Sequence, residues 1–172
     1  FPSIPPSRSL EGGFFYINNL SYLCVAKTDT YMSYIISDNK RCGVIGYGSW
    51  ATALVHTLER NKIEIWWHIR NEEILESMET EGRNAKYLSD VEFDTSLITA
   101  TSDINEVVRN CEIILIAAPS AFLAYILAEL DEPLENKFIL SATKGIIEEE
   151  YTTITEYFKN KYGLHYTNLG LI

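Results

Sequence analysis

Long hydrophobic runs are missing from this sequence of 172 residues, and basic residues are few. No stretch approaches about 18 uninterrupted apolar residues, so we expect no membrane span. The 14 lysines and arginines stand against 24 aspartates and glutamates, which gives a net charge of −10 at pH 7. Because a surface that binds phosphate backbones is normally basic, we expect no nucleic-acid partner.

Cysteine and histidine are also scarce, with three residues of each. Cys24, Cys42 and Cys111 cannot all pair within one chain, and the last two border apolar runs. We therefore expect reduced, structural cysteines in a cytoplasmic protein, and we see no secretory signal at the N-terminus. The histidines form neither a catalytic triad nor a metal-ligand pattern, so we expect them to be structural or solvated and predict no metal: His56, His68 and His165.

The sequence divides into two parts of different character. Residues 1–40 begin with "FPSIPPSRSLEGG", which is rich in Pro, Ser and Gly, and we interpret them as an N-terminal extension of unknown role. From residue 41 the pattern becomes regular, and hydrophobic residues make up 47% of the whole chain. That proportion is typical of a globular chain, so we predict one folded domain over residues 41–172.

Short apolar runs alternate with amphipathic segments throughout residues 41–172. We expect strands at 42–46, 63–68, within 96–103, at 112–118 and 137–143, and beginning at 166. We expect helices at 49–60, 71–82, 104–110, 119–130 and 148–163. Strands that alternate with helices across short connections predict an α/β fold: a Rossmann-type, doubly wound parallel sheet with helices on both faces. The most apolar run, 112–118, should be a central strand.

A cluster of small residues lies where the first strand meets the first helix. The pattern Gly46-x-Gly48-x-x-Ala51 has the form of the dinucleotide fingerprint. Gly46 would permit the tight turn, Gly48 the close approach of a pyrophosphate, and Ala51 close packing of helix on strand. The N–H groups at the helix start would attract the anion. A plain tight turn is the alternative.

The end of the second strand bears on which dinucleotide binds. A strict NAD site usually has Asp or Glu there, bonded to the ribose 2′-hydroxyl, but this chain reads Trp67, His68, Ile69 and Arg70. Arg70 could bind a 2′-phosphate through its planar guanidinium, and the alternative is a solvated surface arginine. We therefore expect the site to accept NADPH at least as well as NADH.

Four further stretches carry a resemblance to a known family. "GYGSWATAL", from Gly46, resembles the "GxGSWGTAL" motif of bacterial NAD(P)-dependent glycerol-3-phosphate dehydrogenases. "GRNAKYLSDVEF", 82–93, is similar to their N-x-x-Y-L-P segment, with Ser89 in place of the proline. "AAPSAFL", 117–123, resembles their V-P-S loop, and "SATKGI", 141–146, their K-G-[IL] motif. The segments fall in the family's order and cover residues 41–172, its N-terminal cofactor domain.

The resemblance implies roles for individual residues. The cofactor-binding residues it implies, with Arg70 added from the reasoning above, are Gly46, Tyr47, Gly48, Ser49, Trp50, Ala51, Arg70, Tyr87, Pro119, Ser120, Phe122 and Lys144. Trp50 would place its ring and indole N–H at the nucleotide's edge, or else pack on the surface or against a second domain. Pro119, Ser120 and Phe122 would lie near the nicotinamide half. Lys144 would contact cofactor and substrate, the alternative being a surface turn.

The reaction that the resemblance implies is hydride transfer between NAD(P)H and dihydroxyacetone phosphate, giving sn-glycerol 3-phosphate for glycerophospholipid synthesis. In the family the main proton-donating lysine lies in a helical C-terminal substrate domain, which has no counterpart in these 172 residues. We therefore expect a fragment that binds the dinucleotide but has no dehydrogenase turnover alone and tends to self-associate. The intact enzyme could be a homodimer.

Two other functions and a negative outcome stay open. The first is the cofactor domain of another oxidoreductase of the 6-phosphogluconate dehydrogenase type, against which the Ser49–Trp50 pair and the N-x-x-Y-L stretch argue. The second is a dinucleotide-binding sensor module without chemistry, which would seldom need a lysine after the fifth strand. The negative outcome is a fold that binds nothing.

Overall fold

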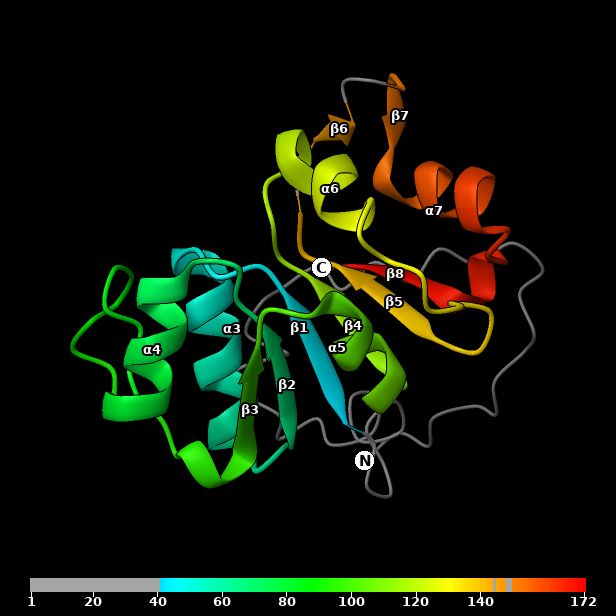
Figure 1. The fold of residues 1–172 in the computed structure, drawn as a ribbon. Helices are drawn as coiled ribbons and strands as arrows, with labels where there is room; N and C mark the ends of the chain where they lie inside the picture. Colours follow the sequence, from blue (N-terminus) through cyan, green and yellow to red (C-terminus); the bar gives the residue numbers. More distant parts are fainter. Residues whose placement is uncertain (1–40, 144, 148–149) are drawn as a thin grey trace, which may run out of the picture.

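A six-stranded parallel sheet forms the centre of the molecule (Figure 1). The computed structural model describes residues 41–143, 145–147 and 150–172. The expectations for residues 1–40, Cys24 included, lie outside that range. The strands of the sheet are β1 (Cys42–Ile45), β2 (Ile65–His68), β3 (Ile98–Thr101), β4 (Ile113–Ile116), β5 (Phe138–Ser141) and β8 (Leu169–Leu171).

The strand order is β3-β2-β1-β4-β5-β8, and all neighbours are parallel. Two neighbours flank β1, so Val44 lies opposite Trp67 of β2 on one side and Leu115 of β4 on the other. The chain thus winds outward from β1 in both directions, as predicted. Between β1 and β4 the order reverses, and in open α/β sheets ligands bind outside the carboxyl ends of the strands at such a point.

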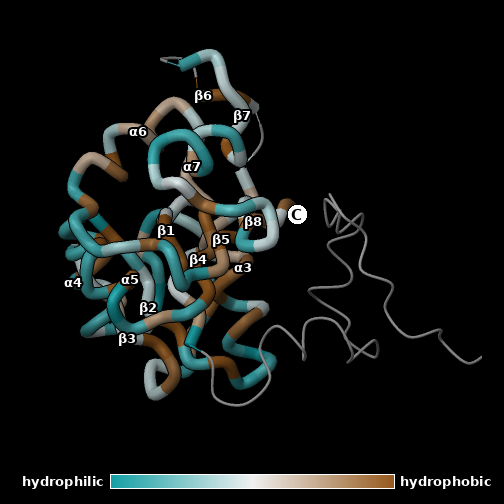
Figure 2. Tube along the Cα trace, turned by 90° about the vertical axis from the view of Figure 1, so that its right-hand side faces the viewer, coloured by the Kyte–Doolittle hydropathy of each residue, from teal (hydrophilic) through white to brown (hydrophobic). Residues whose placement is uncertain are grey.

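Helices cover both faces of the sheet and enclose two hydrophobic cores. The alternation of β4 shows this, since Ile113 and Leu115 belong to one core while Ile114 and Ile116 belong to the other. Figure 2 shows the strands as a largely hydrophobic centre beneath more hydrophilic outer segments. The helices are α3 (Ser49–Arg60) and α4 (Glu72–Glu81) on the first core, and α5 (Ile104–Asn110), α6 (Ser120–Leu127) and α7 (Ile154–Tyr162) on the second.

Capping residues fix the ends of two helices. The Asn71 side chain accepts a hydrogen bond from the Ile74 N–H at 3.1 Å and begins α4. Gly82 ends that helix in the left-handed conformation, with φ of 64°. Asp103 caps α5 by accepting from the Asn105 N–H at 2.8 Å. The helix predicted at 49–60 has the same bounds as α3.

The helix predicted over 148–163 is wrong in its first part. Helix α7 begins only at Ile154, and a hairpin of β6 (Ile146–Ile147) and β7 (Thr152–Thr153) precedes it. Thr153 and Glu156 form a reciprocal capping box, which satisfies the first N–H groups and fixes the helix start there. The sequence pattern misled because the glutamates of 148–150 are good helix formers.

Two other predicted elements are shorter than expected. Helix α6 ends at Leu127, not at residue 130, and the last strand begins at Leu169 after the 3₁₀ turn Tyr166–Asn168. Another 3₁₀ turn, Thr95–Leu97, leads into β3.

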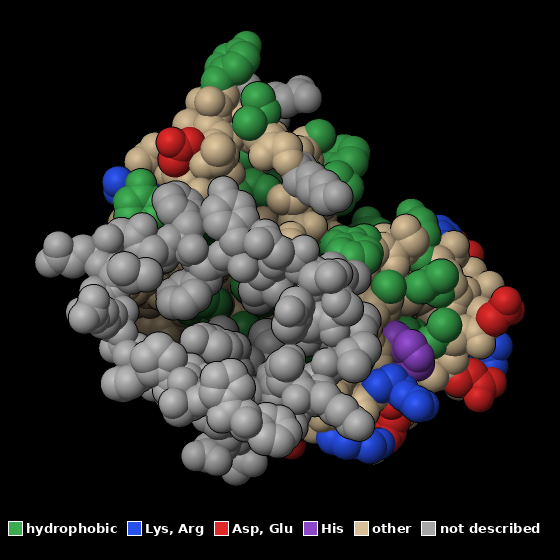
Figure 3. Space-filling model, turned by 180° about the vertical axis from the view of Figure 1, so that it is seen from behind, with side chains coloured by type: hydrophobic (Ala, Val, Ile, Leu, Met, Phe, Trp, Pro, Cys, Tyr) green, Lys and Arg blue, Asp and Glu red, His purple; other side chains and the backbone are tan. Residues whose placement is uncertain are grey.

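Seen from behind, acidic and basic side chains are interspersed on the α3–α4 side of the molecule (Figure 3). Hydrophobic side chains stand at the far end that the hairpin forms.

Cys42 and Cys111 are buried and free, as expected. Burial raises the pKa of both thiols, that of Cys111 to about 12, so they stay protonated at neutral pH.

None of the helices in the described part of the chain is long and apolar enough to cross a membrane. Residues 41–143, 145–147 and 150–172 contain no group of three or more His, Cys, Asp or Glu suited to a metal ion.

The buried histidine at the end of β2 makes stability depend on pH. Burial lowers the pKa of His68 from 6.5 to about 4, against the opposing effect of a hydrogen bond with the Ser102 backbone. Between these two pKa values, His68 binds a proton in the unfolded chain but not in the folded chain. We predict that the free energy of unfolding falls by roughly 3 kcal/mol as pH drops from the unfolded to the folded pKa.

Urea denaturation at a series of pH values would measure this loss. His68→Gln should remove that part of the pH dependence, while the exposed His165→Gln should keep it. Parallel curves for wild type and His68→Gln would show that another group is responsible.

Candidate functional site

The turn after β1 touches the loop after β4 so closely that only glycine fits. Gly46 has φ of +120°, and a Cβ there would lie 2.7 Å from the backbone carbonyl carbon and oxygen of Ala117 and 2.8 Å from the Ala118 nitrogen. Side chains rarely adopt this backbone conformation, and backbone atoms cannot move aside cheaply. Gly46 therefore sets the distance between the two loops at the switch point.

The second glycine of the motif opens onto free space. A Cβ on Gly48 would meet no atom within 4 Å among the described residues. Helix α3 begins directly after it, with no side-chain cap and no acidic residue in its first turn. Its first N–H groups have no intrahelical acceptor, so this helix start favours an anion. The start of α7, by contrast, is closed by the Thr153–Glu156 capping box.

The carbonyl oxygens of the turn are held by the protein itself. The buried Trp67 indole Nε1–H donates to the Gly46 oxygen at 2.7 Å. The Asn84 Nδ2–H₂ group donates to the Tyr47 oxygen at 3.0 Å, and the Thr52 hydroxyl donates to the Gly48 oxygen at 2.9 Å. With these negative ends engaged by protein donors, the turn is fixed in a form whose N–H groups can serve a ligand.

Asn84 is a site residue that sequence reasoning matched to the family motif but gave no role. It is fully buried, and its Nδ2 group also donates to the Thr52 hydroxyl at 2.9 Å. Its Oδ1 accepts from the Lys86 and Tyr87 N–H groups, each at 3.1 Å. One side chain thus joins the glycine turn to the loop that carries Tyr87, whose ring is 37% exposed.

The Trp50 side chain spans the site, and its indole N–H donates to the protein backbone. The indole Nε1–H donates to the Ala142 backbone oxygen at 3.2 Å, so it links the start of α3 to the end of β5. The role of this N–H at the nucleotide's edge stays a prediction, and in the structure its acceptor is the Ala142 backbone. The residue is 39% exposed, and the role of its ring in cofactor binding stays a prediction. Of its neighbours in the motif, Ser49 is exposed and Ala51 is buried against the sheet.

The loops after β4 and β5 lie side by side. The Thr143 hydroxyl donates to the Ile116 and Ala118 oxygens at 3.2 and 2.8 Å, which ties the two strand ends together. A Cβ on Gly145 would lie 3.3 Å from Ser120 Oγ. The predicted residue Ser120 therefore lies close to Gly145. Lys144 itself lies outside the described residues.

Aromatic side chains on α6 are unusually exposed. Phe122 is 59% exposed and Tyr125 is 63% exposed, so neither is a core residue. The Arg70 guanidinium lies 4.4 Å from the centre of the Tyr125 ring, and its Nη2 is 3.1 Å from Glu129 Oε1. A hydrogen bond with Tyr125, followed by the charge of Glu129, raises the pKa of Arg70. Arg70 is thus held by α6 and the residues after it, unlike a freely solvated arginine.

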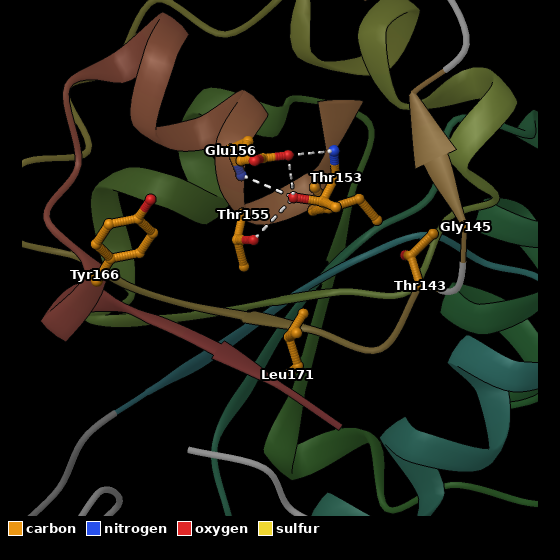
Figure 4. Close-up of a pocket in the computed structure, with 8 residues that line it drawn as sticks. Thr143, Gly145, Thr153, Thr155, Glu156, Tyr166 and Leu171 are labelled. Carbon is orange, nitrogen blue, oxygen red and sulfur yellow. Dashed lines mark hydrogen bonds between the residues drawn. The ribbon is translucent and has the colours of Figure 1, made fainter. Parts of the chain in front are cut away.

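A pocket of about 380 Å³ lies at the carboxyl ends of β5 and β8. Figure 4 shows its wall of hydroxyl groups beside the capping box, with Thr153 and Glu156 bonded to one another. In the same view Tyr166 lies beside the capping box, Leu171 lies below it, and Thr143 and Gly145 lie on the other side. The lining residues are Thr143, Gly145, Thr153, Ile154, Thr155, Glu156, Tyr166 and Leu171. This pocket adjoins the turn of Gly145, at the end of the site where the nicotinamide half is predicted.

The chain is similar to known proteins in sequence and in fold. Residues 41–172 match the family described as the NAD-dependent glycerol-3-phosphate dehydrogenase N-terminus. The chain belongs to this family. The family predicted from the motifs is therefore confirmed. The roles of the individual site residues stay predictions.

Curated relatives of the chain include bacterial enzymes. The chain is 30% identical over 121 residues to the glycerol-3-phosphate dehydrogenase [NAD(P)+] of Limosilactobacillus reuteri, a match that covers 68% of this chain and 36% of that protein. It is 32% identical over 133 residues to the enzyme of the same name from Malacoplasma penetrans, covering 74% and 38%. The chain thus spans little more than a third of these relatives' length.

Solved structures of glycerol-3-phosphate dehydrogenases share the fold. The Coxiella burnetii enzyme superposes with a TM-score of 0.64 at 23% identity, covering 73% of this chain and 39% of that one. The Saccharomyces cerevisiae enzyme gives a TM-score of 0.65 at 21% identity, covering 78% and 41%. The predicted doubly wound α/β class is confirmed by these matches.

We predict that Asn84→Ala lowers the free energy of unfolding by about 2–4 kcal/mol, because it leaves the Tyr47 carbonyl and the Thr52 hydroxyl without their buried donor. Asn84→Asp should also destabilise, since an ionised carboxylate cannot donate to a carbonyl. The matched control is Asn61→Ala, whose amide donates to the Thr57 oxygen on the exposed end of α3. Urea denaturation measures all three variants. Equal losses at Asn84 and Asn61 would contradict the assignment.

Proposed function

We propose that residues 41–172 bind NAD(P)H as the cofactor domain of a glycerol-3-phosphate dehydrogenase, and that the longer protein interconverts dihydroxyacetone phosphate and sn-glycerol 3-phosphate. One observation carries the proposal: the uncapped start of α3 lies under the Gly46–Gly48 turn, at the switch point between β1 and β4. The family match supports it. The open space beside Gly48 fits a pyrophosphate that approaches the backbone closely.

The arrangement of the strand ends supports a direction for the ligand. The pyrophosphate would lie on the N–H groups of Ser49 and Trp50 at the start of α3. The adenosine half would extend toward the end of β2 and Arg70, because that strand carries the ribose contact in this fold. The other half would extend over the ends of β4 and β5, beside Pro119 and Ser120. When bound there, the nicotinamide supplies or accepts the hydride.

Lys144 is the residue to which we assign a contact with cofactor and substrate. It follows β5 at the carboxyl edge, next to Gly145, which lies close to Ser120 Oγ. An ammonium group at that edge could hold a substrate phosphate, or the carbonyl oxygen on which negative charge develops during hydride addition. The main proton-donating lysine that the family resemblance implies has no counterpart in this chain, so Lys144 is not assigned that role.

The activity, the substrates and the assembly all belong to the longer protein and are proposals. The relatives' names give glycerol 3-phosphate as their substrate, and this chain matches little more than a third of their length. Reduced, buried Cys42 and Cys111 support a reducing compartment, for which we propose the cytoplasm. The homodimer stays a prediction.

Calorimetric titration of the 172-residue chain with NADH and with NADPH tests the binding proposal. We expect saturable binding of at least one of them at a single site, because the turn is already formed without ligand. Circular dichroism on the same sample establishes that the chain is folded. A folded chain that binds neither nucleotide would contradict the proposal.

We predict that Lys144→Ala weakens NADH binding by roughly three- to tenfold, the loss of one charge-assisted contact, with little effect on stability. The matched control is Lys62→Ala, because the Lys62 side chain is 73% exposed and pairs with Asp94 away from the strand ends. Titration gives the dissociation constant and urea denaturation the stability. An unchanged affinity in Lys144→Ala would remove this residue from the cofactor site.

A further inference from the structure

Arg70 has an acidic partner within the chain. Its Nη2 lies 3.1 Å from Glu129 Oε1, and its guanidinium stacks on the Tyr125 ring at 4.4 Å. The Arg70 side chain is only 24% exposed, against 49% for Glu129. The cation that a 2′-phosphate would need is therefore already neutralised by a carboxylate from the segment after α6.

The backbone around Glu129 is fixed in place by the start of α5. The Asn105 Nδ2–H₂ group donates to the Glu129 backbone oxygen at 2.9 Å. The Asn105 Oδ1 accepts from the N–H groups of Asp131 and Glu132, at 2.8 and 3.1 Å. One asparagine thus anchors both sides of the turn that presents the Glu129 carboxylate. The carboxylate that pairs with Arg70 is therefore carried by an anchored backbone.

The location of the pair gives it a consequence for the cofactor. Arg70 comes two residues after β2, the strand whose end meets the adenosine ribose in this fold. A strict NAD site has an acid there, and this chain has none at the strand's end. Glu129 brings a carboxylate to the same arginine from a distant part of the sequence. A 2′-phosphate would compete with that carboxylate for Arg70 and be repelled by it, whereas a 2′-hydroxyl would not.

We propose that Glu129 determines cofactor specificity: it occupies Arg70 and shifts the preference of the site from NADPH toward NADH. The inference rests on the proposed function, since it assumes that the dinucleotide binds at this edge of the sheet. It modifies the expectation from the sequence, in which Arg70 alone made NADPH at least as good a ligand as NADH. Glu129 acts by pairing with Arg70 and by the negative charge of its own carboxylate. It makes no contact with the nicotinamide half of the dinucleotide.

The test measures dissociation constants for NADPH and NADH by calorimetry in wild type, Glu129→Gln and Glu132→Gln. Glu129→Gln should tighten NADPH binding by roughly two- to fivefold relative to NADH, the range expected for release of an exposed ion pair and its repulsion. Glu132→Gln is the matched control, because Glu132 lies on the same turn but pairs with Arg109 at 2.6 Å. It should leave the ratio unchanged.

A second pair of variants separates competition for Arg70 from a general change of charge. In an Arg70→Ala background, Glu129→Gln should lose most of its effect on the NADPH to NADH ratio. An equal gain with and without Arg70 would overturn the competition mechanism. So would a ratio that Glu129→Gln leaves unchanged, or that Glu132→Gln shifts as much.

Failure of the proposed function gives a different result. If the folded wild-type chain binds neither nucleotide, the cofactor assignment and this inference both fall. If wild type binds NADH and NADPH but Glu129→Gln leaves the ratio of the two dissociation constants unchanged, only the inference is overturned.

Discussion

The contact between the Gly46 turn and the backbone of Ala117 and Ala118 is the constraint on which the rest of the site depends. It brings the exits of β1 and β4 together at the one place where the strand order reverses. It also aims the chain so that α3 starts at the carboxyl edge with its N–H groups uncovered. Any side chain at Gly46 would separate the two loops and displace the start of the helix.

Distant residues hold this turn in shape. Trp67 and Asn84 bond its carbonyl oxygens from β2 and from the loop after α4, and Trp50 ties the following helix to the end of β5. The anion-binding groups are thus ordered before a ligand arrives, which lowers the entropy cost of binding. Arg70 is held in place as well, but by the carboxylate of Glu129. The glycine turn therefore presents its N–H groups to an anion, whereas the Arg70 guanidinium is already paired with one.

Local sequence pattern predicts the parts of this molecule that depend on neighbours in the chain. The strand after residue 41, the helix over 49–60 and the caps at Asn71 and Asp103 follow from periodicity and short-range hydrogen bonds. The partners of Trp50 and Arg70 lie 92 and 59 residues away, so no local pattern could reveal them. The hairpin before α7 was missed because a run of glutamates has the propensity of a helix, while the Thr153–Glu156 capping box starts the helix later.

Two of the three tryptophans of the chain lie at the cofactor turn and the helix that follows it, and each is held there by its indole hydrogen bond. Trp67 is fully buried beneath Gly46, while Trp50 is partly exposed at the start of α3. The emission of these two side chains therefore reports on this corner of the molecule. A reduced nicotinamide absorbs at the wavelengths where indole emits. A bound reduced cofactor would therefore quench this tryptophan emission by energy transfer, whereas the oxidised form would not.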